Sequence, residues 1–132
     1  MINLAIETAM RKGELLSLPW SNINLETKRA TLAQTKNGKP RIVPLSAQAI
    51  RCLTQLPKES DRVFPISEIA IRQAWARLMK SCEITDMTFH DLRHEAISRL
   101  FEKGLNVPEV ALISGHKTAS QLFRYVQIHL PD

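Results

Sequence analysis

The sequence predicts an α+β fold that is mostly helical, with one small three-stranded antiparallel sheet near the amino-terminus. The 132 residues are 44% hydrophobic, which suffices for one core and is too many for a disordered chain. Apolar and polar residues alternate between residues 22 and 45, around an Asn-Gly pair. Elsewhere the apolar residues recur at helical spacing, so we expect one domain in which helices surround a short sheet.

Two short helices are expected before the sheet. The apolar spacing of residues 1–9 predicts the end of a helix. A second helix covers about residues 13–18 and stops at Pro19, because proline has no N–H to donate and clashes with the preceding turn.

The sheet is expected from three strand-like runs of sequence. These runs are Ile23–Leu25, Ala30–Leu32 and Ile42–Leu45. Asn37 and Gly38 lie between the last two runs, and both tolerate the positive φ of a tight hairpin turn. Lys36 and Lys39 flank this pair, so we expect the tip of the last hairpin to be basic.

Helices are expected over the rest of the chain. Ser46 and Ser67 can cap helix amino-termini. Gly104 can end a helix in the left-handed conformation, and Pro108 suits a first turn. The expected helices cover residues 46–56, 67–82, 90–103, 108–114 and 118–128. Their Leu, Ile, Val and Phe positions are expected in the core.

The chain is basic, with a formal net charge of +5 and a pI of about 9.6. Residues 1–66 carry ten Lys and Arg against five Asp and Glu, whereas residues 67–132 carry eight of each. A basic stretch can bind phosphates, but it can equally be the solvated face of an ordinary domain. The charge therefore permits a nucleic-acid partner without establishing one.

Several classes of protein are not expected. No apolar run approaches the roughly 20 residues that cross a bilayer, and the amino-terminus lacks the basic region of a secretory signal. Cys52 and Cys82 have neither CxxC spacing nor a nearby His pair, which argues against a disulfide framework or a zinc site. We expect a cytoplasmic protein with no membrane partner.

The helix expected over residues 90–103 carries two polar residues on its apolar side. At about 100° per residue, His90 and Arg93 fall inside the arc that holds Leu92 and Ile97. A buried guanidinium is costly unless it meets an anion. Either Arg93 pairs with an internal carboxylate and His90 is a core histidine, or both side chains face an anionic ligand.

Three further features each have an ordinary explanation alone. Arg11 lies at a helix end beside Gly13, and the Gly115-His116 pair ends a later helix. Tyr125 is the only tyrosine and lies on the last expected helix, where a tyrosine at the edge of the core is common.

Taken in order, these residues resemble the catalytic domain of the tyrosine recombinases, the phage integrase family. The resemblance extends from Met10 to about Ile128. Its motifs are Arg11 in Arg-Lys-Gly-Glu-Leu, Lys36 in Thr-Lys-Asn-Gly-Lys, His90-Asp91-Leu92-Arg93-His94, Gly115-His116, and Tyr125. Each motif alone is unspecific, but the ordered set is highly specific.

The resemblance implies an enzyme that cleaves and rejoins DNA through a 3′-phosphotyrosyl intermediate. Its implied catalytic residues are Arg11, Lys36, His90, Arg93, His116 and Tyr125. Tyr125 would be the nucleophile, His90 the proton acceptor, and Lys36 the proton donor to the leaving 5′ oxygen. The residue types suit this reaction, because arginine forks can stabilise charge on non-bridging oxygens and a phenol needs a base. Neither a metal ion nor ATP is expected as a cofactor.

The resemblance also implies roles for other residues, and some of these roles have an alternative. Lys39 could replace Lys36 as the acid, although the family's lysine usually begins this turn. Glu14 matches an acidic position that supports the site, or is a surface glutamate. Contacts with the DNA backbone are expected from Lys12, Lys39, Arg41 and Lys117.

The resemblance also implies partners and a larger protein. The partner is double-stranded DNA, on which the full-length protein is expected to form a tetramer and to be associated with the nucleoid. Because Arg11 and Tyr125 lie close to the two ends, residues 1–132 are expected to be a catalytic domain without its amino-terminal DNA-binding domain. Such a chain should bind DNA weakly and in a salt-sensitive manner.

Two other hypotheses compete with a recombinase. One is a DNA-binding remnant that has lost its chemistry, against which the complete set of catalytic residues argues. The other is a helix-turn-helix regulator, whose recognition helix should expose its polar residues. The helix over residues 90–103 instead directs Arg93 inward, which disfavours a regulator.

Overall fold

The computed structural model describes residues 1–32 and 40–115. Their elements are α1 (Ile2–Thr8), α2 (Lys12–Ser17), the 3-10 helix η1 (Trp20–Asn22), β1 (Ile23–Asn24), β2 (Arg29–Leu32), β3 (Arg41–Pro44), α3 (Ala47–Thr54), α4 (Glu68–Ser81), α5 (His90–Glu102) and α6 (Val107–Ser114). None of these helices has the length and apolarity of a membrane span.

The helices begin and end close to where the sequence predicts. The Oγ of Ser46 accepts a hydrogen bond from the Ala49 N–H at 3.1 Å, and Ser67 caps α4 in the same way. Gly104 follows α5 with a φ of +94°, the left-handed conformation expected of a C-terminal cap. These predictions are confirmed, whereas the helix expected over residues 118–128 lies outside the described residues.

The sheet has the order β1-β2-β3 and is antiparallel throughout. Ala30 pairs with Val43 and Leu32 pairs with Arg41, so these four side chains share one face. That face is the buried one, and Ile42 between Arg41 and Val43 is 55% exposed. The period of two therefore directs a guanidinium into the molecule and an isoleucine out of it.

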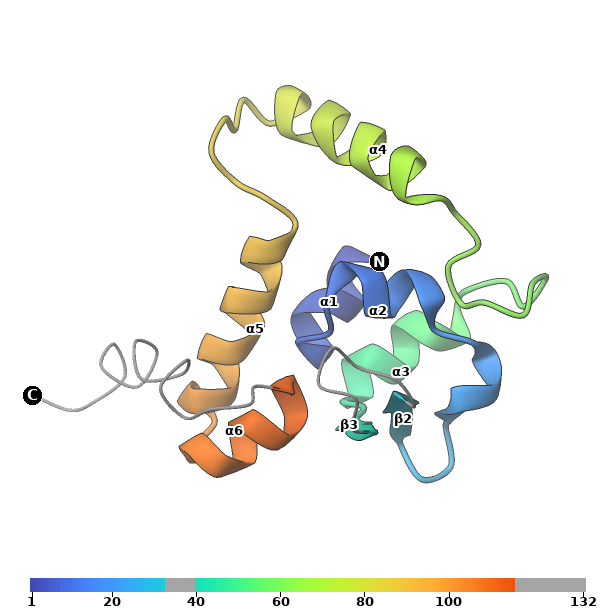
Figure 1. The fold of residues 1–132 in the computed structure, drawn as a ribbon, viewed down its shortest axis with the longest axis vertical. Coiled ribbons are helices and arrows are strands. Elements are labelled where there is room, and N and C mark those ends of the chain that lie inside the picture. The colour runs from blue at the N-terminus through green and yellow to red at the C-terminus, as the bar shows by residue number, and fades with distance from the viewer. Residues whose placement is uncertain (33–39, 116–132) are drawn as a thin grey trace, which may run out of the picture.

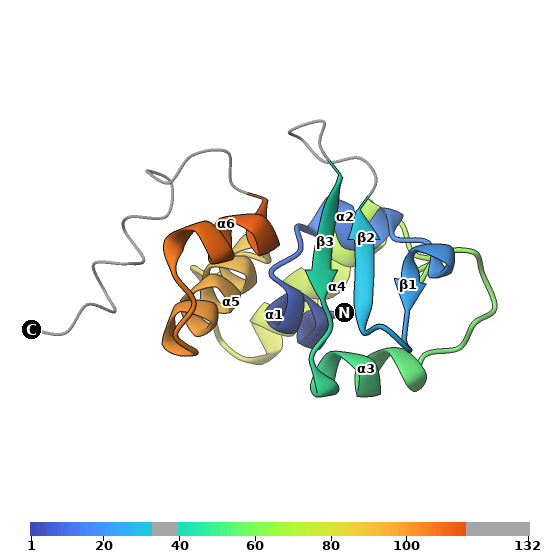
Figure 2. The ribbon, with the colours of Figure 1, turned by 90° about the horizontal axis from the view of Figure 1, so that it is seen from below.

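Helix α1 lies between the sheet side of the molecule and the α5–α6 pair (Figure 2). The larger core cluster joins α1, α2, the sheet, α3 and Leu92 of α5. A smaller cluster holds Ala9, Ala96, Ile97 and Val110, and it packs α5 against α6. The end of α1 is thus where the two halves of the core meet.

Helix α4 crosses one side of the molecule, and its ribbon lies apart from those of the other helices (Figure 1). It contains no buried residue, although Ile71, Trp75 and Met79 are half-buried along one stripe. Ile69 of α4 is 67% exposed and Leu112 of α6 is 75% exposed. The prediction that the apolar positions of all helices belong to the core is therefore wrong for these residues, because no described element covers them.

Candidate active site

A pocket of about 310 Å³ opens between the start of α2 and the start of α5. Its described lining consists of Met10, Arg11, Lys12, Thr88, Phe89, His90 and Arg93. This lining contributes two guanidiniums, an ammonium and an imidazole, and it contains no carboxylate. Such a pocket is suited to an anion, and the planar forks of the two arginines suit phosphate oxygens.

Arg11 is placed at the pocket by the beginning of α2. It is the residue before the helix, with the extended backbone of an N-cap, and its N–H donates to the Glu14 Oε1 at 2.8 Å. Its Nη1 lies 3.6 Å from the Glu14 Oε2. Glu14 therefore holds both the main chain and the side chain of Arg11.

Arg93 is buried, with only 4% of its surface exposed. Its Nη1 donates to the carbonyl oxygen of Ala9, and its Nη2 donates to that of Ser114 at 2.6 Å. Ala9 ends α1 in the left-handed conformation with a φ of +59°. The described hydrogen-bond acceptors of Arg93 are thus two main-chain oxygens at helix ends, and not an internal carboxylate.

The charge of Arg93 is costly in this position. Burial, followed by the nearby Arg11 and Arg41, lowers its pKa to about 9. That value still lies above neutral pH, so the guanidinium remains a cation under physiological conditions. The pocket therefore holds a destabilised positive charge, and an incoming anion would relieve it.

His90 begins α5 and lines the pocket with an exposed side chain, so it is not a core histidine. Its ring meets that of His94 edge to face, with the ring centroids 4.9 Å apart. Partial desolvation, followed by His94, Arg93 and Arg11, lowers the pKa of His90 below its ordinary 6.5. An imidazole with a lowered pKa is neutral at pH 7 and can accept a proton.

Glu14 is a partly buried anion beside the pocket. Its Oε2 accepts from the Arg41 Nη1 at 2.8 Å, and its Oε1 accepts from the Arg41 Nη2 at 3.0 Å. Burial alone would raise the pKa of the Glu14 carboxyl, but the hydrogen bonds from Arg41 and from the Arg11 N–H outweigh it and lower the pKa below 4.5. Glu14 is therefore not the surface glutamate of the alternative interpretation.

Arg41 differs from its prediction as a residue that contacts DNA. Its side chain is 5% exposed, and its guanidinium donates to Glu14 and, through Nε, to the carbonyl oxygen of Ile113 at 2.7 Å. A side chain held in this way is not available to a phosphate at the surface. The sequence did indicate an inward position for Arg41. It lies two and four residues before Val43 and Leu45, which are core residues, so all three side chains lie on the same face of the strand.

The remaining predicted residues divide into two groups. Lys12 lines the pocket and forms an ion pair with Glu68 of α4 at 3.4 Å, so its contact with DNA stays a prediction. The other predicted residues, Lys36, Lys39, His116, Lys117 and Tyr125, lie outside the described residues. Among the described residues no three His, Cys, Asp or Glu side chains gather as a metal site requires.

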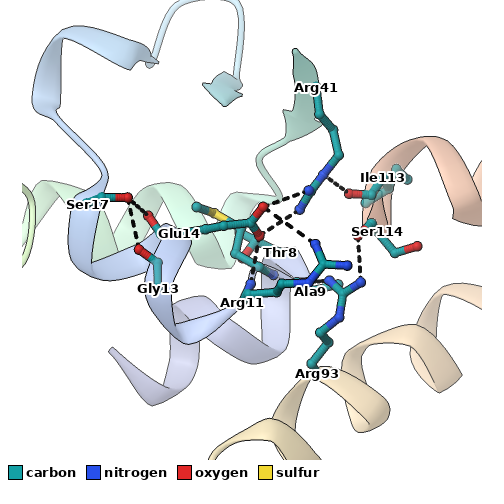
Figure 3. Close-up of polar contacts among 11 residues, drawn as sticks. Thr8, Ala9, Arg11, Gly13, Glu14, Ser17, Arg41, Arg93, Ile113 and Ser114 are labelled. Atoms are coloured by element: carbon teal, nitrogen blue, oxygen red, sulfur yellow. Dashed lines mark hydrogen bonds and ion pairs between the residues drawn. The ribbon is translucent and has the colours of Figure 1, made fainter. Parts of the chain in front are cut away.

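The structure thus brings Arg11, His90 and Arg93 to one pocket from two distant parts of the chain (Figure 3 shows the two arginines). The same view shows Arg41 joined to Glu14 beside Arg11. The sequence alone did not indicate the role of Ala9, whose carbonyl oxygen receives Arg93. Nothing in an alanine at a helix end predicts a left-handed backbone.

Comparisons with known proteins agree with this geometry. A family model described as the phage integrase family matches residues 1–130. The shufflon-specific DNA recombinase of Escherichia coli is 46% identical over 130 residues, which cover 97% of this chain and 34% of the recombinase. The chain therefore spans about a third of the length of that relative.

Two solved structures share the fold. The XerA recombinase has a TM-score of 0.79 at 23% identity, over 98% of this chain and 52% of its own. The Tn1549 transposon integrase, solved in complex with circular intermediate DNA, has a TM-score of 0.78 at 19% identity, over 94% of this chain and 52% of its own. The predicted α+β fold is confirmed, and the chain belongs to the phage integrase family, the tyrosine recombinases.

Proposed function

We propose that this chain is the catalytic domain of a site-specific DNA recombinase, which cleaves and rejoins DNA through a 3′-phosphotyrosyl intermediate. The observation that carries the proposal is the pocket, whose described lining brings together Arg11, Arg93 and His90 and holds no carboxylate. The shufflon-specific DNA recombinase, at 46% identity, supports the reaction class. Among the similar structures, the Tn1549 integrase bound to DNA supports double-stranded DNA as the partner.

In the proposed mechanism, the pocket holds the phosphate that is cut. Arg11 and Arg93 donate to its non-bridging oxygens, where negative charge concentrates in the transition state. The energetic penalty on the Arg93 cation falls further as that charge develops, so the pocket stabilises the transition state more than the bound substrate. The arginines perform the charge stabilisation that metal ions provide in other phosphoryl transfers, and the mechanism uses neither metal nor ATP.

The covalent step requires residues that the family resemblance supplies. The Tyr125 oxygen attacks phosphorus, the new P–O bond forms, and the bond to the 5′ oxygen breaks. His90 accepts the phenol proton, Lys36 donates a proton to the 5′ oxygen, and His116 donates a hydrogen bond to a non-bridging oxygen. The reverse reaction with another 5′ hydroxyl reseals the strand, because the phosphotyrosyl bond conserves the energy of the phosphodiester.

The larger protein is part of the proposal. The chain spans 34% of the shufflon recombinase, and we propose that an amino-terminal domain outside residues 1–132 grips the other side of the DNA. Assembly of four subunits on DNA, in the cytoplasm at the nucleoid, belongs to the same proposal. Lys12 at the pocket rim, together with Lys39 and Lys117, would contact the DNA backbone.

A covalent trapping experiment tests this function. The protein is incubated with nicked duplexes drawn from the DNA that flanks its coding sequence, since a nick lets the cut fragment diffuse away and traps the intermediate. We expect a protein–DNA adduct that survives denaturation and disappears in Tyr125→Phe. Tyr125→Phe is also the matched control, because it removes one oxygen and should leave DNA retention unchanged. Retention without an adduct in the unsubstituted protein would favour the DNA-binding remnant instead.

A further inference from the structure

Arg41 joins the strand that carries it to two helices, one of which begins at the pocket. It lies on β3, its Nη1 and Nη2 grip both carboxylate oxygens of Glu14 on α2, and its Nε donates to the Ile113 carbonyl of α6. It does not line the pocket itself. A buried guanidinium with this many directed hydrogen bonds fixes the relative placement of the groups that it joins.

One end of this network reaches Arg11. The Glu14 carboxylate that Arg41 grips also accepts the Arg11 N–H at 2.8 Å and lies 3.6 Å from the Arg11 Nη1. Two parallel hydrogen bonds from Arg41 fix the plane of that carboxylate. The orientation of Arg11 toward the pocket therefore depends on Arg41, although the two arginines do not bond to each other.

The other end of the network reaches Arg93. Ile113 and Ser114 are consecutive residues at the end of α6; the Ile113 carbonyl accepts from Arg41 at 2.7 Å, and the Ser114 carbonyl accepts from Arg93 at 2.6 Å. Two arginines from different elements thus hold one helix end (Figure 3). A displacement of Arg41 would move the carbonyl that positions Arg93.

Gly115, the next residue, shows how closely Arg41 is fitted. A Cβ added at Gly115 would lie 2.5 Å from the Arg41 Nη1 and 3.0 Å from its Cζ. Gly115 also has a φ of +78°, which side chains rarely adopt. The end of a free arginine could move aside, but this one is bonded to Glu14 and Ile113, so the glycine is required at that point.

We propose that Arg41 is a positioning residue for the reaction: it couples Arg11 to Arg93 through Glu14 and the end of α6, and Gly115 makes room for it. The inference rests on the proposed function, because the group that it positions is the phosphate pocket. Arg41 acts through other residues and does not touch the substrate.

The test separates positioning from folding and from simple charge. In Arg41→Lys the charge stays, but one ammonium cannot replace the paired bonds to Glu14 together with the bond to Ile113. We expect a folded protein that retains nicked DNA with an affinity within twofold of the unsubstituted chain. Its adduct should form on the order of 10²-fold more slowly, the size of effect that a misplacement of about 1 Å produces. The control is Arg99→Lys, since Arg99 is an exposed arginine paired only at the surface with Glu95.

A second variant keeps the inference testable if Arg41→Lys does not fold. Gly115→Ala retains Arg41 and all charges but presses on its guanidinium, and we expect slower adduct formation. The double variant, Arg41→Lys with Gly115→Ala, should lose less of its rate of adduct formation than the product of the two separate fold-losses. Both changes disturb the same contact, so their effects are not independent. Adduct formation by Arg41→Lys or by Gly115→Ala at the rate of the unsubstituted chain, or multiplicative losses, would overturn the inference.

Failure of the proposed function can be distinguished from failure of the positioning role of Arg41. If the unsubstituted chain forms no adduct, that function fails, and a titration with inorganic phosphate decides the inference by itself. Arg41→Lys should then bind phosphate at least several-fold more weakly, since both pocket arginines depend on Arg41. Equal phosphate affinity in Arg41→Lys and in the unsubstituted chain would overturn the positioning role.

Discussion

Helices α4 and α5 have nearly the same length, 14 and 13 residues, and opposite relations to the core. α5 buries Leu92, Arg93, Ala96 and Ile97, whereas α4 buries none of its residues. Both carry an apolar stripe at helical spacing, so the stripe alone does not decide burial. The difference lies in the partners: α1 and α6 pack on α5, whereas α4 reaches the larger core cluster through Trp75, which stays half-buried.

The difference in burial between the two helices explains why the Arg93 cation lies on α5. An arginine on α4 would lie in solvent, where its cation is stable and its side chain is free to move. On α5 the same residue type is enclosed by the end of α1 and the end of α6, whose carbonyl oxygens orient it. The covered helix therefore supplies an ordered and costly cation, which is the kind of group that stabilises a transition state.

The largest effect is expected from Arg93→Ala on the covered helix. Loss of this cation should slow adduct formation by about 10²- to 10³-fold, the usual size for one group that stabilises developing charge. Single-turnover trapping with nicked DNA measures the rate, and some DNA retention should persist. Normal cleavage by Arg93→Ala would contradict the assignment of the pocket. Arg99→Ala, on the exposed side of the same helix, is the matched control.

The next effect concerns the stability that each helix contributes. Ile97 is 1% exposed on α5, and Ile69 is 67% exposed on α4. We expect Ile97→Ala to lower the free energy of unfolding by about 2–5 kcal/mol, because it leaves a cavity. Ile69→Ala removes the same atoms from a surface and should change that free energy by less than about 0.5 kcal/mol. Urea unfolding followed by circular dichroism measures both, and equal losses would mean that α4 is covered in solution.

These two helices also show how far the sequence predicts the molecule. Periodicity and capping residues placed both helices within a residue or two, because those signals are local. The inward position of Arg93 was predicted for the same reason. That Ile69 stays exposed could not be predicted, since it depends on which elements lie opposite α4.

The site shows the same limit. Arg11, His90 and Arg93 were found through the order of their motifs, and the structure adds that they share a pocket. Arg41 was assigned to DNA as one of four basic residues expected to contact its backbone. Its actual partner, Glu14, is separated from it by 27 residues and by a fold that brings β3 against α2 and α6. Pairings at that range are set by tertiary packing and not by local pattern.

The smallest effect concerns pH and the exposed His90 at the start of α5. His90 has a pKa below 6.5, and the neutral imidazole accepts the proton in the proposed mechanism. Cleavage should therefore rise with pH through that lowered pKa and exceed half of its plateau already at pH 6.5. The second-order rate of adduct formation, measured from pH 5 to pH 8, reports the pKa of the free protein.

A substitution of His94 tests whether His90 sets this pH dependence. The charge of His94 lowers the pKa of His90, so His94→Phe should move the midpoint of the profile to higher pH while His90 remains able to act. An unchanged midpoint would mean that another group sets the acid limb. A midpoint above pH 6.5 in the unsubstituted chain would contradict the role of His90 as the proton acceptor, because burial, His94, Arg93 and Arg11 together hold its pKa below that value. The exposed imidazole at the start of α5 would then share the pocket with the buried cation without taking the phenol proton.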